Sequence, residues 1–472
     1  MKYSIIILLS ALTVIKVYGQ SEIRGETIIK DIDYLASDRL EGRFPGSKGN
    51  ELAARYIQRA FKRNKLEPLF HNYEQLFNVV VKLDAPVSDN FIKASGNDDF
   101  LLNKDYSIFP FSGSALVHAN VFFTKSNKET FEGNTSLKAN WVLLWRNKDH
   151  SVVSDSLSDY AISRKAFELG AAGIILISPD LVDPKDVLVR LRPRKEKPLP
   201  VPVIQLSRVA WQKLRPVLFH DTTDNKTDVS SIPLTVSVAI EKEEVVAKNI
   251  AGIIRGNDPI LSNEYIVLGA HYDHLGYGGY GTGSLQPDTV AIHNGADDNA
   301  SGTAALLAIA AELSRNRKDL KRSVIVIAFS AEEEGLLGSR YFTDHLPVPG
   351  STIKVMVNMD MVGHLNKENQ LYMGGAGTFP GGVDFMKKTG EGSGLNLVVH
   401  AGSVGGSDHV SFYQKGISCV GLHTGGHPQY HRPSDDADLI NVPGIEKVAR
   451  YIYNVVYGLA NRTEAFSFIK QD

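Results

Sequence analysis

Histidine and acidic residues recur after apolar runs in the second half of the chain, and these residue types can hold a metal ion. The first pair is His271 and Asp273, in Gly-Ala-His-Tyr-Asp-His. At the end of a strand, Asp273 can fold back and accept the imidazole N–H of His271, which fixes the tautomer that presents the other ring nitrogen to a metal. Taken alone, the pair is better explained as a structural or surface histidine.

Carboxylates dominate the next two clusters. Asp297 and Asp298 lie in a turn before a serine that opens an Ala-rich helix, where acidic residues also have the ordinary role of complementing the helix dipole. Glu332, Glu333 and Glu334 follow a strongly apolar run. Because adjacent carboxylates repel one another unless cations neutralise them, a dinuclear metal centre would explain this third cluster.

The last candidates are Asp360, which closes an apolar strand, and the histidines His427 and His431 in a loop before the last helix. Neither histidine stands out by itself, but together the clusters supply His, Asp, Glu, Asp and His. Zinc takes imidazole nitrogen and carboxylate oxygen, and two ions that share a bridging carboxylate need about four further protein ligands. The sequence therefore indicates a two-metal site.

Alternating apolar runs past residue 247 predict the elements that position these residues. The expected strands are 265–270, 323–329, 354–359 and 418–422, and the expected helices are 301–313 and 336–345. Such alternation predicts an α/β fold with a mainly parallel mixed sheet sandwiched by helices. Ligands in such sheets lie beyond the carboxyl ends of the strands, where the polar clusters fall.

The first half of the chain has a different texture. Helical spacing covers residues 31–40 and 50–61, with a Gly-rich turn between them. Short apolar runs follow, and they predict strands at 115–123, 141–145, 172–178 and 201–206, with a helix at 159–170. We therefore expect a large domain from residues 20–77 and 240–472, and a β-rich domain inserted at 78–239.

Residues 1–19 have the pattern of a secretory signal peptide. Lys2 precedes an apolar stretch over 4–15, and the small residues Val17 and Gly19 allow cleavage before Gln20. The pattern predicts an exported protein, periplasmic or secreted. The apolar stretch is too short to span a bilayer comfortably, so we expect cleavage and no stable membrane anchor afterwards. An uncleaved, retained anchor is the alternative.

Composition narrows the classes of partner. The 472 residues include 51 basic and 53 acidic side chains, so no charge excess favours nucleic acid or an anionic membrane surface. The single cysteine, Cys419, cannot form an intramolecular disulfide, and we expect a buried thiol.

Two other motifs have a less specific explanation. The glycine-rich run 276–283 does not open a helix, so we expect a loop at the rim of the site rather than a phosphate-binding loop. Ser407, Asp408 and His409 have the residue types of a nucleophilic triad, but contiguous residues rarely adopt that geometry, and no Gly-x-Ser-x-Gly turn accompanies them. We therefore reject serine hydrolysis.

The polar clusters, in this order, resemble the M28 family of zinc aminopeptidases. The resemblance rests on Gly-Ala-His-Tyr-Asp-His, Gly-Ala-Asp-Asp-Asn-Ala-Ser-Gly, Ala-Glu-Glu-Glu-Gly-Leu-Leu-Gly-Ser, Asn-Met-Asp-Met and Tyr-His-Arg-Pro-Ser-Asp, and it covers Asn249 onward and Leu35 to Ile57. It implies an enzyme that uses two Zn²⁺ ions to hydrolyse the first bond of peptides with a free amino terminus. The segment 167–177 similarly resembles a protease-associated domain, which would act as a lid.

Transferred residue by residue, the resemblance implies roles for the candidates. Asp298 would bridge both ions, and its peptide bond to Asn299 would be cis. His271 and Asp360 would complete the shell of one ion, and Glu333 and His431 that of the other. The implied catalytic residues are Glu332, as the general base, and Asp273, as the support of His271.

Glu334 departs from the pattern, because relatives often carry an apolar residue there. The alignment of Gly335 and Leu336 favours Glu332 as the base and Glu333 as the ligand.

Several related activities stay open on sequence alone. The metal site accounts for hydrolysis of a peptide bond, but the substrate pocket determines which end of a peptide is cut. A carboxypeptidase or a dipeptidase is therefore an alternative. Glutaminyl cyclases share the scaffold but bind a single zinc. A binding module that has lost its ligands is disfavoured, because every ligand position is filled here.

Overall fold

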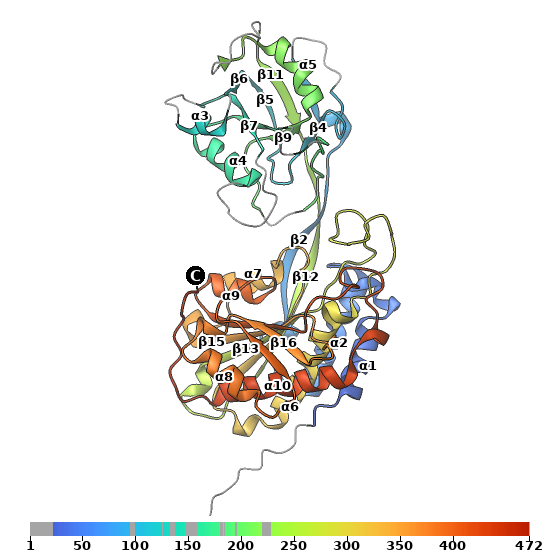
Figure 1. The fold of residues 1–472 in the computed structure, drawn as a ribbon, viewed down its shortest axis with the longest axis vertical. Helices are drawn as coiled ribbons and strands as arrows, with labels where there is room; N and C mark the ends of the chain where they lie inside the picture. Colours follow the sequence, from blue (N-terminus) through green and yellow to red (C-terminus); the bar gives the residue numbers. More distant parts are fainter. Residues whose placement is uncertain are drawn as a thin grey trace, which may run out of the picture.

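The structure, a computed structural model, has two lobes joined by a pair of long strands (Figure 1). It describes residues 22–94, 100–124, 126–132, 137–146, 158–179, 183, 185–193, 196–219 and 228–471. The predicted signal peptide, residues 1–19, lies outside the described residues. The connecting strands, β2 (Glu74–Asp84) and β12 (Glu241–Ile254), pair antiparallel along most of their length. The expected domain boundary at 77/78 therefore falls inside a continuous strand.

The large lobe is built on a nine-stranded mixed sheet, as the alternating pattern predicts. Its four central strands lie parallel in the order β14, β13, β15 and β18. They span, in the same order, Ser323–Phe329, Tyr265–His271, Ile353–Met359 and Ser418–His423. β12 runs antiparallel beside β14 and also pairs with the short strand β1 (Glu67–Pro68). On the other side, β16 (Gln370–Gly374) runs antiparallel to β18 and parallel to β17 (Asn396–Val399).

Helices cover both faces of this sheet, as expected (Figure 1). One face carries α1 (Gly25–Leu35), α2 (Lys48–Arg63), α6 (Gly302–Arg315), α8 (Gly382–Thr389) and α10 (Val442–Asn461). The opposite face carries α7 (Leu337–Asp344) and α9 (His409–Gln414), whose Phe342 and Phe412 pack on Phe329 of β14. Because apolar side chains are buried on both faces, most residues of the central strands are Val, Ile, Leu, Ala, Met or Phe.

The inserted lobe is β-rich and has apolar cores of its own. A six-stranded sheet has the order β10-β6-β7-β8-β9-β4, and a second sheet has the order β3-β11-β5. These strands are β3 (Phe91–Lys93), β4 (Tyr106–Ile108), β5 (Ala115–Ala119), β6 (Val121–Phe123), β7 (Trp141–Trp145), β8 (Gly173–Ile177), β9 (Val203–Leu206), β10 (Asp228–Val229) and β11 (Leu234–Val238). The helices α3 (Asn127–Glu132), α4 (Asp159–Glu168) and α5 (Arg208–Leu218) complete the lobe.

The first predicted helix, 31–40, is displaced. The helix begins earlier, at Gly25, and ends at Leu35, and the following segment Asp38–Arg43 forms a tight turn in which Glu41 and Gly42 have positive φ angles. Cys419 is buried in β18, as expected. Among the described residues, no helix combines the length and the apolar character that a membrane crossing requires.

Candidate metal centre

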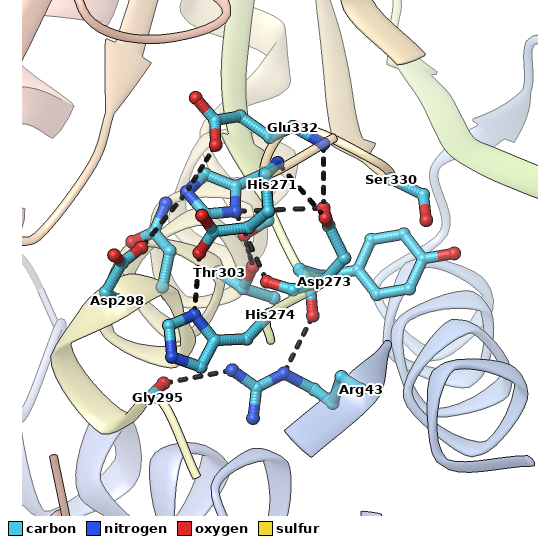
Figure 2. A network of polar contacts seen from close by, with 12 residues as sticks. Arg43, His271, Asp273, His274, Gly295, Asp298, Thr303, Ser330 and Glu332 are labelled. Carbon is cyan, nitrogen blue, oxygen red and sulfur yellow. Dashed lines mark hydrogen bonds and ion pairs between the residues drawn. The ribbon is translucent and has the colours of Figure 1, made fainter. Parts of the chain in front are cut away.

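The five predicted ligands come together from five segments of the large lobe. His271 ends β13, Asp298 lies in the turn before α6, Glu333 follows β14, Asp360 follows β15, and His431 lies in the loop before α10. A cavity of about 500 Å³ is lined by Asp298, Glu332, Glu333, Asp360 and His431, among others. Figure 2 shows how His271, Asp298 and Glu332 point toward one another. These residues meet because parallel strands deliver their carboxyl ends to one edge of the sheet.

Two histidines face the two oxygens of Asp298. His271 Nε2 lies 3.4 Å from Asp298 Oδ1 and 3.4 Å from Asp360 Oδ1. On the other side, His431 Nε2 lies 3.1 Å from Asp298 Oδ2 and 3.2 Å from Glu333 Oε2. The donors thus form two groups that share Asp298.

These donor atoms fit a pair of metal ions. The Nε2 atoms of both His271 and His431 are buried and have no hydrogen-bond partner. A buried polar atom without a partner is costly, and nitrogen and carboxylate oxygen are the donors that zinc prefers. A cation on each side of Asp298 would satisfy both nitrogens and would offset the repulsion among the carboxylates.

Backbone carbonyls orient the two imidazoles. His271 Nδ1 lies 3.3 Å from the carbonyl oxygen of Asp273 and 3.8 Å from its carboxylate, so the carbonyl rather than the predicted carboxylate is the hydrogen-bond partner. The Asp273 carboxylate instead accepts the backbone N–H groups of Glu332 and Glu333, at 3.2 and 3.4 Å. His431 Nδ1 lies 3.0 Å from the carbonyl of Gly283. In both histidines Nε2 is left to face the carboxylates.

The buried setting separates the proton affinities of two adjacent glutamates. Burial raises the pKa of Glu332 well above its ordinary value, and nearby carboxylates raise it further. Burial and Asp298 also push the pKa of Glu333 upward, but His431 and His274 bring it down to about 2. Glu332 therefore binds a proton more tightly than an ordinary glutamate does, and Glu333 binds one less tightly.

Glu334 lies apart from this pair. Glu332 and Glu333 line the cavity, whereas Glu334 is not among the described residues that do. Burial, Asp273 and Glu333 raise the pKa of Glu334 to about 8, and Arg192 of the inserted lobe opposes that shift.

The backbone beside the ligands has uncommon conformations. Ala331, Met361 and His431 have φ angles of 58°, 58° and 53°, in a region that residues other than glycine rarely adopt. Such conformations persist only where the surrounding structure holds them, and they cluster at functional sites. The peptide bond between Asp298 and Asn299 is cis, as the family resemblance implies.

Two supporting residues escaped the sequence analysis. His274 Nδ1 lies 2.7 Å from Glu333 Oε1, and its ring also belongs to a group with Asp298 and Glu333 that could hold a metal. Asp435 accepts the backbone N–H groups of Asp297 and Asp298 at 3.0–3.1 Å. Both residues stand inside motifs that were noted, but a histidine or an aspartate one position further along a loop carries no signal of its own.

The two other motifs adopt the structures expected of them. The glycine-rich run 276–283 is a loop at the rim of the site, where the Gly283 carbonyl contacts His431. Ser407 Oγ accepts the side-chain amide of Asn358 at 2.9 Å, and His409 Nδ1 has no hydrogen-bond partner. The residues 407–409 therefore do not form a nucleophilic triad.

The chain is similar in sequence to known peptidases. Residues 249–456 match the family model described as peptidase family M28. The chain is 28% identical over 236 residues to aminopeptidase YwaD of Bacillus subtilis, and this match covers 48% of the chain and 47% of that protein. It is 28% identical over 203 residues to leucine aminopeptidase 2 of Trichophyton equinum, covering 41% of the chain and 37% of that protein. The chain thus spans half or less of the length of these relatives.

Solved structures show the same fold. An aminopeptidase from Aneurinibacillus sp. strain AM-1 superposes with a TM-score of 0.55 at 21% identity, over 95% of this chain and 97% of that one. BSAP, a zinc aminopeptidase from Bacillus subtilis, superposes with a TM-score of 0.54 at 20% identity, over 93% and 96% of the two chains. The residues 249–456 that match the family model lie in the large lobe.

Proposed function

From the match of residues 249–456 to peptidase family M28, we propose that this chain is an exported aminopeptidase that binds two zinc ions. The observation that carries the proposal is the shared carboxylate: Asp298 faces His271 with one oxygen and His431 with the other. Asp360 would complete the first ion's protein ligands, and Glu333 those of the second. Zinc bound there would supply Lewis acidity toward water and the peptide carbonyl.

Glu332 is the proposed general base. Its carboxylate lies 3.9 Å from His271 Nε2 and lines the cavity, so it can reach a water molecule beside the ligand atoms. Because its pKa is raised well above the ordinary value, Glu332 is suited to take a proton from the attacking water and to return it to the leaving amine. Asp273 holds the backbone of this segment and, through its carbonyl, the orientation of His271.

The charge of the cavity favours the amino end of a peptide. Four carboxylates line it, from Asp298, Glu332, Glu333 and Asp360, and none of the described lining residues is lysine or arginine. Three of these carboxylates are proposed zinc ligands, whose charge the ions would offset. A substrate carboxyl terminus, however, would find no lysine or arginine partner among the described lining residues. This observation favours an aminopeptidase over a carboxypeptidase.

The inserted lobe is proposed to act as a protease-associated lid. The Arg190 guanidinium lies 4.1 Å from the ring centroid of Tyr280, which belongs to the loop at the rim of the site. Since Arg190 comes from the inserted lobe, this contact joins the two lobes beside the cavity.

The test combines metal content with the choice of substrate end. The purified chain should contain zinc, cleave a peptide with a free amino terminus and leave its acetylated twin intact. Replacing Glu332 with Gln should abolish turnover while zinc stays bound, because the amide cannot accept a proton from water. Cleavage of the acetylated peptide would refute the aminopeptidase, and conversion of amino-terminal glutamine to pyroglutamate would indicate a cyclase.

A further inference from the structure

A second cluster of metal-ligand type lies next to the proposed zinc centre and shares no residue with it. Asp297, His364 and His427 each place one donor atom within 4.8 Å of the other two. The three residues come from the turn before α6, the loop after β15 and the loop before α10. Three segments far apart in the sequence therefore converge on one point.

The donor atoms of this cluster are buried and lack partners. Asp297 is fully buried, and its Oδ1 accepts the backbone N–H of Gly363 at 2.6 Å. Its Oδ2 has no hydrogen-bond partner and lies 3.3 Å from His427 Nε2. The Nε2 atoms of His364 and His427 are also buried without hydrogen-bond partners, and the two rings lie 4.1 Å apart.

A simple ion pair explains only part of this arrangement. A protonated His427 would attract the Asp297 carboxylate, but the Nε2 atom of His364 would stay unpaired beside a cationic ring. One cation among the three would satisfy all of these atoms at once.

We propose that Asp297, His364 and His427 form an additional metal site, which takes zinc or a similar divalent transition ion. Two imidazoles and one carboxylate suit such ions, whereas calcium and magnesium prefer oxygen ligands throughout. The ion is expected to be structural, because each of its ligands lies close in sequence to a ligand of the catalytic centre: Asp297 to Asp298, His364 to Asp360, and His427 to His431.

Zinc stoichiometry tests the site. The chain is stripped with a chelator, dialysed against Zn²⁺ and measured by elemental analysis, together with the variants His364→Ala and His427→Ala. Each variant should hold one zinc fewer per chain than the wild type. The matched control is His118→Ala, which removes an exposed histidine of the inserted lobe and should leave the zinc count unchanged. Equal zinc content in the wild type and both cluster variants would overturn the proposal.

A ligand-competent replacement separates metal binding from an ion pair and from misfolding. His427→Cys supplies a thiolate, which is a zinc ligand but cannot form an ion pair with Asp297. It should recover the zinc that His427→Ala loses, and failure to do so in a chain with a wild-type circular dichroism spectrum would also overturn the proposal. This test is independent of the catalytic centre. If the wild type holds one zinc and both cluster variants lose it, the additional site is upheld and the two-zinc centre is refuted.

Discussion

Arg43 connects the amino-terminal segment to the candidate metal centre, and its replacement gives a stringent test of the structure. Its buried guanidinium donates to the carbonyls of Tyr272 and Leu35, at 2.7 and 2.5 Å, and to those of Asn294 and Gly295, at 2.7 and 2.9 Å. Figure 2 shows the guanidinium below His274, with a dashed line to Gly295. Burial lowers its pKa to about 10, so the side chain is charged at neutral pH.

Replacing Arg43 with Met keeps much of the side-chain length and removes every donor. Four carbonyls then lose a hydrogen bond, and each buried acceptor left unpaired costs about 1–3 kcal/mol. Removing the buried charge also removes its desolvation penalty, which offsets part of the loss. We therefore expect the free energy of unfolding of the large lobe to fall by about 3–6 kcal/mol. Zinc affinity should fall about 10–100-fold, as it does when residues that support metal ligands are lost.

Two spectroscopic probes assign the effect to one lobe during urea denaturation. All three tryptophans, Trp141, Trp145 and Trp211, lie in the inserted lobe, so tryptophan fluorescence reports on that lobe alone. Far-ultraviolet circular dichroism reports on the helices of both lobes. In Arg43→Met the large lobe should lose its dichroism at a urea concentration about 1–2 M lower than in the wild type, given an m-value of about 3 kcal/mol/M. The fluorescence midpoint should not change.

The control makes the same substitution on the neighbouring helix. Arg55 of α2 has a side chain that is 60% exposed and forms an ion pair with Glu51 four residues earlier. Arg55→Met should change the free energy of unfolding by about 0.5 kcal/mol or less. If Arg43→Met unfolds at the same urea concentration as Arg55→Met, the four hydrogen bonds do not hold the large lobe together and the reasoning fails.

Three further perturbations test other parts of the molecule. His274→Ala should weaken zinc binding about 10–100-fold, and His274→Asn, whose amide can replace the Nδ1–H donor, should recover most of it; equal zinc affinity in all three chains would contradict a supporting role for His274. Glu264 pairs with the buried Arg322 at 2.8 Å, and although burial alone would raise its pKa, Arg322 and a nearby lysine lower it below 4.5. Glu264→Gln should therefore destabilise the fold by about 1–3 kcal/mol above pH 4.5, and the difference from wild type should vanish as the pH falls through the lowered pKa; a difference in denaturation midpoint that is constant with pH would be inconsistent with this pair. Asp84 pairs directly with Glu241, so a two-residue turn can replace the inserted lobe between them, and the shortened chain should hydrolyse longer peptides more readily; an unchanged size preference would argue against a lid.

The sequence predicted central strands of both lobes most accurately, for an identifiable physical reason. The strands 141–145 and 323–329 have the predicted bounds, because each is a continuous apolar run buried on both faces and bounded by polar residues. The edge strand β17 and its neighbour β16 were not predicted, because such short strands contain too few apolar residues to show a period. Strand β12 was not predicted either, since its first half is exposed and begins with Glu-Lys-Glu-Glu.

In the site, some residues could be predicted from their type alone, whereas the role of others depends on their position in the folded chain. Histidines and carboxylates at strand ends were predicted as ligands because few other functions require that set of donors. Arg43 lies in a motif noted from the sequence, but its role depends on which carbonyls the folded chain brings within its reach. Such long-range contacts, 229 and 252 residues apart in the chain, cannot be deduced from local spacing.

The loops that carry the ligands are held by buried polar side chains that bond to their backbone. Asp435 accepts the N–H of Asp298, and Asp273 accepts that of Glu332. Asn299 accepts the N–H of Met361, directly after Asp360. A loop has no ladder of its own to satisfy these groups, so each ligand position depends on a second residue elsewhere in the chain. If the ligand motifs were transferred to another chain without these partners, the donor atoms would be kept but their arrangement would be lost. The pairs of ligand and partner, rather than the ligands alone, therefore define this centre.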